Sequence, residues 1–582
     1  MQDRWDLSFM YESFDDPKLA ADMASVPGLT EKVKAALDAD LPPKEKLEGL
    51  LVAFDDLEKT LRRIGEFAWM TMATDAMNAR AAQIADKVDV MENEARLLSS
   101  AMQRYIGSVE NLDEVIASSE KLTEVAFALR ESADEAKHTI PAEIEPWILQ
   151  MSLSGGSAFS QLRDKLDSTH LVSFRGEEIP LSAARAKAYD PDPAVRREAY
   201  EAEIASYAKM ELPMSYCLNA IKQEAITLAK AKGFDSVLDM TLARSRMDRE
   251  TLDALWKAVG EYLPDFRRYL KAKAKLLGHK DGLPFYDLFA PVGQSSTYTI
   301  EQAHDKLLQE MGKFTPEMAE FMDNAFKQRW IDVYPRAGKT GGAFCSSLAE
   351  YERSLVMTNF QGSFSDVSTL AHELGHAWHN RCMKGLPAVM RHYPMPLAET
   401  ASIFNETMLS YQCLASCKPE EELYLLENGL MEATQTVVDI YSRFLFEQEV
   451  VNTRPDHAMT VDELKDAMLR AQDASYGDGL QADCRHPYMW ACKSHYYSSG
   501  LNFYNFPYCF GLLFGKGVFA QWLEKGADFV PVYNQLLRSC GSGTIADVAA
   551  SVGIDVRSVD FWRSSLEVVR KDIDRFCELC EK

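Results

Sequence analysis

The chain has 582 residues, of which 47% are hydrophobic and 26% are charged. This composition is typical of a folded globular protein and excludes a fibrous repeat or a disordered chain. Lys and Arg number 63 against 88 Asp and Glu, so the formal net charge of −25 repels a polyanion at long range. We therefore expect a large protein that buries a core and has no nucleic-acid partner.

The first residues of the chain and its cysteines predict the cellular compartment of the protein. No basic segment followed by an apolar run opens the sequence, and no run of about 18 apolar residues occurs, so we expect neither export nor a membrane partner. The 11 cysteines are an odd number and begin only at Cys217, which is a poor pattern for a disulfide framework. We expect reduced thiols in a cytoplasmic protein. The sequence leaves the oligomeric state open.

The N-terminal part of the chain carries helical periodicity. From Thr30 to Lys137 apolar residues recur every three or four positions, with few Gly or Pro residues. We interpret Met70, Met72, Met77 and Trp69 within this run as core residues.

Residues 171–181 place strand-favouring side chains on both sides of a glycine, which predicts a short hairpin. The Asp-Pro-Asp-Pro segment 190–193 then interrupts the chain, and we expect a domain boundary near residue 195. This divides the chain into an N-terminal helical lobe, 1–195, and a second domain, 196–582. The helical signal resumes over 194–232, 252–277 and 300–327.

The segment from Tyr334 to Phe360 differs from its surroundings, because several glycines lead into runs of strand formers. It predicts a small sheet just before the next helix. Helices then continue to the C-terminus, with a break expected at the glycines of residues 540–543. The fold class is mainly α.

Residues 372–376 read His-Glu-Leu-Gly-His inside a segment that favours a helix, capped by Ser365 or Asp366 and ending before Gly385. Four-residue spacing puts His372 and His376 on one helix face, where two imidazoles can bind one metal ion. Glu373 then projects beside the open position of that ion and can take a proton from water. A third ligand is still needed.

A carboxylate follows in the next helical segment, which Pro396 opens. Glu399 and Glu406 lie two turns apart on one face of the expected helix, among apolar neighbours such as Ile403 and Phe404. Buried carboxylates need a partner. A metal ligand at Glu399 and a supporting carboxylate at Glu406 account for both, and the alternative is plain surface charge.

His379 shares the His372 face and competes for the role of third ligand. A separation of seven residues is about 10.5 Å along the helix axis, too far for both rings to reach one ion. A third histidine ten residues after the first would stand at position 382, which is Cys382. We expect His379 to support the site or to line the pocket.

The segment 493–508 is dense in tyrosines around His495. Hydrolysis of a peptide bond through a tetrahedral intermediate needs hydrogen-bond donors for the oxyanion, and His or Tyr side chains can supply them. The alternative interpretation is aromatic packing in a core, and for each tyrosine both interpretations stay open.

Together these residues resemble the thimet oligopeptidase and oligoendopeptidase F family of zinc peptidases. The opening Trp5-Asp6-Leu7-Ser8 is similar to the oligoendopeptidase F branch. The matching segments include Gly341-Gly342-Ala343-Phe344-Cys345, Asn359-Phe360 with Gly362, Thr369 to His379, Ala398-Glu399-Thr400-Ala401-Ser402 with Asn405-Glu406, and Phe503-Tyr504 with Tyr508 and Gly511.

The resemblance implies a two-lobed helical body with a deep central channel and a small β-sheet next to the catalytic helix. It implies one Zn²⁺ per chain, with His372, His376 and Glu399 as ligands. Glu373 would be the general base and Glu406 would support a ligating histidine. The strand at Gly342, Ala343 and Phe344 would pair with the substrate backbone, and His379 would also contribute to substrate binding. His495 matches a substrate-binding histidine of the family, with Tyr504 and Tyr508 as its partners.

We therefore expect a zinc-dependent endopeptidase that hydrolyses short unfolded peptides, with 196–582 as its catalytic domain. One alternative is a carboxypeptidase of the same family. Another is a peptide-binding protein that keeps zinc without catalysis, but an intact Glu373 argues against it because a structural zinc site uses four protein ligands and no base.

Overall fold

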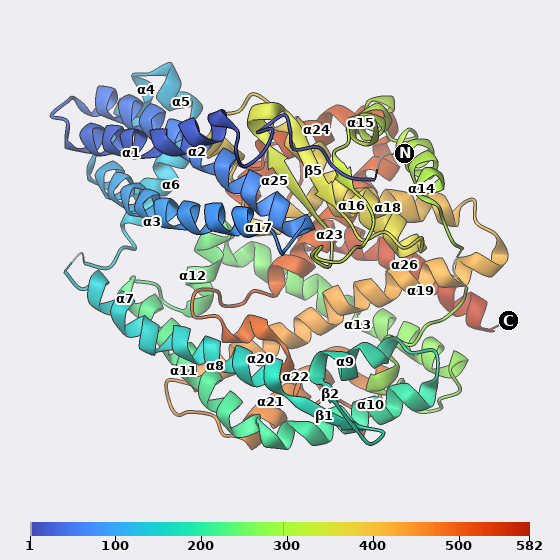
Figure 1. Cartoon of the computed structure of the whole chain (residues 1–582). Helices are drawn as coiled ribbons and strands as arrows, with labels where there is room; N and C mark the ends of the chain where they lie inside the picture. The colour runs from blue at the N-terminus through green and yellow to red at the C-terminus, as the bar shows by residue number, and fades with distance from the viewer. Residues whose placement is uncertain (1–2, 142, 295, 582) are drawn as a thin grey trace. The chain divides into compact units, whose positions relative to one another are not determined.

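A computed structural model of the chain describes residues 3–141, 143–294 and 296–581 (Figure 1). Helices dominate these residues, and the strands form one sheet of two strands and one of three. The predicted mainly α class is confirmed. No helix of the described residues combines the length and the apolar character needed to cross a bilayer.

Contacts within the chain group it into two compact units, each assembled from three chain segments. Unit 1 comprises Met1–Thr139, Thr297–Tyr393 and Gly526–Gly543. Unit 2 comprises Ile140–Ser296, Pro394–Lys525 and Thr544–Lys582. The division into 1–195 and 196–582 stays a prediction.

Unit 1 begins with three long helices that pack against one another, as the blue ribbons of Figure 1 show. Leu50, Leu57 and Ile64 recur at seven-residue spacing on α2 and are all buried, so the apolar stripe expected from the sequence faces this core. The predicted helical run is confirmed. The helices are α1 (Pro17–Asp38), α2 (Pro43–Thr74), α3 (Ala79–Ser108), α4 (Leu112–Ala117), α5 (Glu120–Glu124) and α6 (Ala126–Ala136).

Two of the core assignments in this run are wrong. Met70 is fully buried, but the side chain of Met77 is 86% exposed and that of Trp69 is 46% exposed. Met77 lies beyond the end of α2 at Thr74, in the turn before α3, so helical periodicity no longer applies to it. Trp69 packs its ring 4.4 Å from that of Phe344 at the surface of unit 1.

The rest of unit 1 holds a small sheet next to a helix, as predicted. The strands are β3 (Ile331–Asp332), β4 (Phe344–Leu348) and β5 (Arg353–Met357), in the order β3-β5-β4, so that β4 is an edge strand. Strand β4 pairs antiparallel with β5, from Phe344 opposite Met357 to Leu348 opposite Arg353. Both strands pack on α16. The helices are α14 (Ile300–Met311), α15 (Pro316–Lys327), α16 (Phe364–Cys382) and α24 (Val530–Ser539).

Unit 2 opens with two helices and the predicted hairpin. Strands β1 (Leu171–Phe174) and β2 (Glu177–Pro180) pair antiparallel around a turn at Arg175 and Gly176, where both residues have positive φ. The first helices of this unit are α7 (Glu145–Ser154), α8 (Gly156–Thr169), α9 (Leu181–Ala186), α10 (Pro193–Ser206), α11 (Glu211–Ala231), α12 (Val237–Arg244) and α13 (Arg249–Leu276).

The second half of unit 2 is a bundle in which α13 packs on α26 and α18 packs on α23. A π-helical turn over Gln435–Asp439 joins α19 to α20. The expected break at residues 540–543 is confirmed, because α24 ends at Ser539 and α25 begins at Ile545. The helices are α17 (Met395–Ala398), α18 (Thr400–Leu414), α19 (Pro419–Thr434), α20 (Ile440–Thr453), α21 (Val461–Tyr476), α22 (Met489–Cys492), α23 (Phe506–Lys525), α25 (Ile545–Ala550) and α26 (Val559–Glu581).

Candidate functional site

The helix that carries the His-Glu-Leu-Gly-His motif is α16, and its start is fixed by a capping box. Ser363 Oγ accepts the amide of Asp366 at 3.1 Å, and Asp366 Oδ2 accepts the amide of Ser363 at 2.9 Å. The prediction that Ser365 or Asp366 is the cap is wrong, because the cap stands at Ser363 and Asp366 is its N3 partner. The helix ends at Cys382, before Gly385, as predicted.

His372 and His376 point their outer ring nitrogens at a common position. Their Nε2 atoms lie 3.2 Å apart, and both side chains are half-buried. Two nitrogens bound to one tetrahedral zinc at about 2.0–2.1 Å would be roughly 3.3 Å apart. The pair therefore has the spacing that a shared metal ion requires.

Glu373 lies on the same helix and is buried. Its negative charge acts on Cys345 of strand β4, where burial and this carboxylate together raise the pKa of the thiol. The Cys345 side chain is therefore a neutral thiol next to the acid. This places the Glu373 carboxylate near the edge strand of the sheet.

Glu399 sits at a break between two helices, and the prediction of one continuous helix is wrong here. Helix α17 ends at Ala398 and α18 starts at Thr400, so Glu399 and Glu406 do not share one regular helix face. Ser402 Oγ donates to Glu399 Oε2 at 2.7 Å and to the backbone carbonyl of Glu399 at 3.0 Å. The bond to Oε2 orients the carboxylate. Glu406 is half-buried within α18.

The backbone of α23 approaches Glu399 closely at a glycine. A Cβ atom added at Gly511 would lie 3.1 Å from the Cβ of Glu399 and 3.5 Å from the carbonyl oxygen of Pro396. The lack of a side chain at Gly511 thus leaves room for Glu399. This gives a physical reason for a glycine that the sequence alone presented only as part of a family pattern.

His372, His376 and Glu399 each offer one ligand atom, and these atoms all lie within 4.8 Å of one another. Two imidazoles and one carboxylate form a donor set that suits a catalytic metal with an open coordination position. The donor chemistry therefore fits a metal ion.

A second group of side chains in unit 2 gathers around His495. The ring of His495 lies 5.3 Å from that of Tyr504 and 5.9 Å from that of Tyr508, and the two phenol rings are 5.6 Å apart. All three side chains are half-buried and so keep some exposed surface. Burial, with the positive charges of Arg443 and Lys493, lowers the pKa of His495, so its imidazole is neutral near pH 7.

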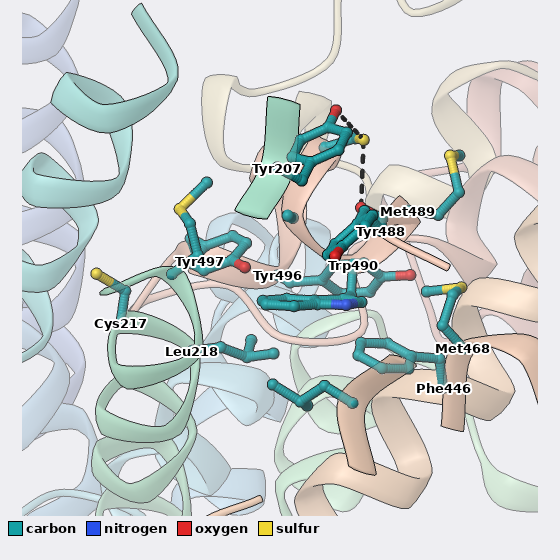
Figure 2. Close-up of a cluster of buried hydrophobic side chains, with 14 of the residues drawn as sticks. Tyr207, Cys217, Leu218, Phe446, Met468, Tyr488, Met489, Trp490, Tyr496 and Tyr497 are labelled. Atoms are coloured by element: carbon teal, nitrogen blue, oxygen red, sulfur yellow. Dashed lines mark hydrogen bonds between the residues drawn. The ribbon is translucent and has the colours of Figure 1, made fainter. Parts of the chain in front are cut away.

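Burial also separates the tyrosines of this segment into two sets. Tyr496 and Tyr497 are buried in the hydrophobic cluster that Figure 2 shows, together with Trp490, Phe446 and neighbouring side chains. The core-packing interpretation is therefore the right one for these two. Tyr508 has a pKa raised first by burial and then by its hydrogen bond with Tyr504, so its phenol keeps its proton.

A buried ion pair that the sequence did not indicate holds the loop between His495 and Tyr508. Glu447 Oε1 accepts Lys222 Nζ at 2.6 Å and the amide of Phe503 at 2.9 Å, while Oε2 accepts Asn505 Nδ2 at 2.8 Å. Lys222 Nζ also donates to the side-chain oxygen Oδ1 of Asn502 at 3.0 Å. Lys222 and Glu447 are 0% and 1% exposed. A buried Lys and Glu in helical stripes, 225 residues apart, carry no local signal that would pair them.

The predicted substrate strand is shorter than expected. Gly342 has a φ of +82° and lies with Ala343 in the turn before β4, so only Phe344 belongs to the strand. Asn359 Nδ2 donates to the carbonyl oxygens of Thr340 and Gly342 at 2.9 Å each and so holds this turn.

His379 has no exposed surface. Its Nε2 donates to the Leu537 carbonyl oxygen at 3.0 Å, and its ring stacks on that of Tyr393 at 4.5 Å. Burial lowers the pKa of His379 to about 3, so the ring is neutral. These contacts favour a role in holding α16 against α24, and the substrate-binding role stays a prediction.

Comparisons with known proteins come from sequence and from structure. The profile of peptidase family M3 matches residues 186–568. Oligopeptidase PepF of Bacillus subtilis is 24% identical over 597 residues, covering 100% of this chain and 88% of that protein. An oligoendopeptidase F homolog of Lactococcus lactis is 27% identical over 67% of this chain and 64% of its own length. Oligoendopeptidase-F from Enterococcus faecium has the same fold, with a TM-score of 0.71 at 18% identity over 97% of this chain and 98% of that one. A crystal structure from Chlamydophila abortus reaches a TM-score of 0.88 at 24% identity, over 99% of this chain and 98% of the other.

Proposed function

Because this chain belongs to peptidase family M3, we propose that it is a zinc-dependent endopeptidase acting on short unfolded peptides. The observation that carries the proposal is the arrangement on α16, where two imidazoles one turn apart present their Nε2 atoms 3.2 Å from each other. The relatives named oligopeptidase and oligoendopeptidase support the class of substrate.

We assign His372, His376 and Glu399 as the zinc ligands, which is supported by the short distances among their ligand atoms. Ser402 orients the Glu399 carboxylate through its 2.7 Å hydrogen bond, as residues behind a metal ligand commonly do. Glu406 has the supporting role toward a ligating histidine that the family resemblance implies. When bound, zinc polarises the scissile carbonyl and makes water more acidic.

Glu373 is the general base in this proposal. Its carboxylate takes a proton from the attacking water and then delivers it to the leaving amine. Its position one residue after His372 and its burial away from bulk water support this role.

His495, Tyr504 and Tyr508 are proposed to bind the substrate and to donate hydrogen bonds to the oxyanion. Their mutual ring contacts and partial exposure support the assignment, since the other two tyrosines of the segment are buried. The raised pKa of Tyr508 keeps its phenol protonated, so that it can donate. Edge strand β4, from Phe344 onward, is proposed to pair with the substrate backbone.

The test is to replace Glu373 by Gln and to follow cleavage of an internally quenched peptide. We expect kcat to fall by about 10²- to 10⁴-fold, because proton transfer by a positioned base contributes about that much, while one zinc stays bound. Glu352→Gln is the matched control, since Glu352 is an exposed glutamate of unit 1 that pairs with Lys384 at 2.7 Å. Normal turnover in the Glu373 variant would remove the base assignment.

Cleavage positions decide between endopeptidase and carboxypeptidase action. Peptides blocked at both ends should still be cut internally, and mass spectrometry of the products reveals the position of each cut. Release of residues only from a free C-terminus would instead favour the carboxypeptidase.

A further inference from the structure

A cavity of about 290 Å³ opens in unit 1 where strand β4 ends. Ser347 and Leu348, the last residues of β4, belong to its lining, and the 3₁₀ turn Ala349–Tyr351 continues from them. The remaining walls come from Met10, α2, residues 121–125 and the segment 386–391. Apolar side chains form much of the surface, among them Leu51, Val52, Val125, Leu386 and Val389.

Two arginines, Arg62 of α2 and Arg391, line this cavity and also a neighbouring one of about 730 Å³. The larger cavity also includes Ala377 and Asn380 of α16, so the two arginines line a space that reaches this helix. Both cavities are lined entirely by residues of unit 1.

Carboxylates act on both arginines from a distance, since the charge of Asp55 affects Arg391 and that of Arg62 affects Glu58, but neither arginine forms an ion pair in the described part of the chain. Within the residues that the structure describes, neither guanidinium lies within 4.0 Å of a carboxylate oxygen. Arg391 Nε donates to the carbonyl oxygen of Leu386 at 2.8 Å, and burial together with the charge of Arg62 lowers the pKa of Arg391. The adjacent Arg63 is different, because it pairs with Asp22 and Glu350 at 3.3 Å each.

The positive charges of Arg62 and Arg391 repel each other, and an anion bound between them would reduce this repulsion. A carboxylate matches the planar donor fork of arginine and binds it through charge-assisted hydrogen bonds. The apolar walls next to the arginines suit an aliphatic or aromatic side chain adjacent to that carboxylate.

We propose that the cavity at the end of β4 is a specificity site, where Arg62 and Arg391 bind a carboxylate of the peptide and the apolar walls hold the neighbouring side chain. The inference rests on the proposed function, because a peptide paired with edge strand β4 would lead into this cavity. The carboxylate belongs either to the C-terminus of the peptide or to an Asp or Glu side chain.

The experiment compares matched quenched peptides on the full-length zinc-loaded protein. In the first pair, one peptide ends in a free carboxylate and the other in an amide. In the second pair both peptides end in an amide, and one has Glu where the other has Gln beyond the cleavage site. In one of the two pairs, the acid should raise kcat/KM by about ten- to a hundredfold, mainly through KM, as charge-assisted bonds of this kind provide. The pair that responds identifies the source of the carboxylate.

In the Arg62→Gln, Arg391→Gln double variant we expect the preference for the acid to fall to less than twofold. Arg62→Lys should keep part of it, because a point charge remains without the fork. Arg130→Gln is the matched control, as Arg130 is an exposed arginine of unit 1 paired with Asp113 at 2.8 Å and lies outside both cavities. Thermal unfolding and zinc content show whether each variant is folded.

Equal rates for acid and neutral peptides in the unmodified protein, or a preference that survives in the double variant, would overturn the proposal. Calorimetric titration of the same peptides into the Glu373→Gln protein separates this failure from failure of the proposed function. If the unmodified protein cleaves none of the peptides but the Glu373→Gln protein binds the acid peptide ten times more tightly than the neutral one, the specificity site stands and the peptidase assignment is refuted.

Discussion

Helix α16 and the segment from Lys493 to Tyr508 both hold polar side chains for the proposed reaction, but the backbone differs between them. On α16 the ring nitrogens of His372 and His376 meet because four residues make about one helical turn. In the other segment short 3₁₀ turns and loops bring His495, Tyr504 and Tyr508 together, and the buried pair Lys222–Glu447 ties the loop down. Local geometry suffices for the first arrangement, whereas the second depends on contacts that are remote in sequence.

The largest effect should come from breaking the remote contact. Glu447→Ala removes the partner of a fully buried lysine and three hydrogen bonds, and we expect the free energy of unfolding to fall by about 3–5 kcal/mol in denaturant titrations. Glu449→Ala is the control, because its ion pair with Arg470 is exposed and should contribute no more than about 1 kcal/mol.

Replacing both residues of this pair separates its effect on the stability of the protein from its effect on the position of the loop. Lys222→Met with Glu447→Leu should recover much of the lost stability, since an apolar pair needs no desolvation of charge. Turnover should stay low, because the amides of Phe503 and Asn505 still lack their acceptor. Full activity in this double variant would show that the ion pair does not position the loop.

The next largest effect concerns the exposed tyrosines. Tyr504→Phe or Tyr508→Phe should raise the barrier by about 3 kcal/mol if that phenol donates to the oxyanion, which is roughly a hundredfold in kcat. Tyr496→Phe and Tyr497→Phe are matched controls, because within the described residues neither hydroxyl has a hydrogen-bond partner. A hundredfold loss of kcat in these controls, with none in the first two variants, would reverse the assignment.

The smallest effect tests the support of the third ligand. Ser402→Ala removes the 2.7 Å hydrogen bond to Glu399, and we expect zinc affinity, measured by competition with a chelator, to fall about tenfold, or about 1.4 kcal/mol. Ser416→Ala, just beyond the end of α18, removes only bonds to the carbonyls of Gln412 and Cys413 and should change nothing. Unchanged zinc affinity in the Ser402 variant would argue that Glu399 does not need this support.

The comparison also explains which parts of the molecule could be predicted from sequence. The stripe of α2, the hairpin at Arg175–Gly176 and the end of α16 follow from periodicity and turn chemistry, and all were predicted. The cap at Ser363 was missed because Ser365 and Asp366 also favour helix starts, and only the reciprocal bonds decide among them.

The errors and omissions share a physical cause. Glu399 stands at a helix break, but its apolar neighbours favour a continuous helix in the sequence. Trp69 lies on a helix whose exposed side depends on where Phe344 packs. Nothing in the tyrosine-rich segment separates Tyr496 from Tyr504, because burial is decided by the cluster around Trp490. Such features depend on contacts between residues that are far apart in sequence, and periodicity contains no information on them.

The division of unit 1 among three chain segments has a consequence for biosynthesis. Helix α24 is synthesised well after α16, yet it supplies Asn534 and Leu537 as partners of Trp378 and His379 on α16. A nascent chain therefore carries α16 without this support until Leu537 has been made. Chains released before that point would lack these contacts, so we expect the proposed proteolytic activity to appear only once α24 has been made.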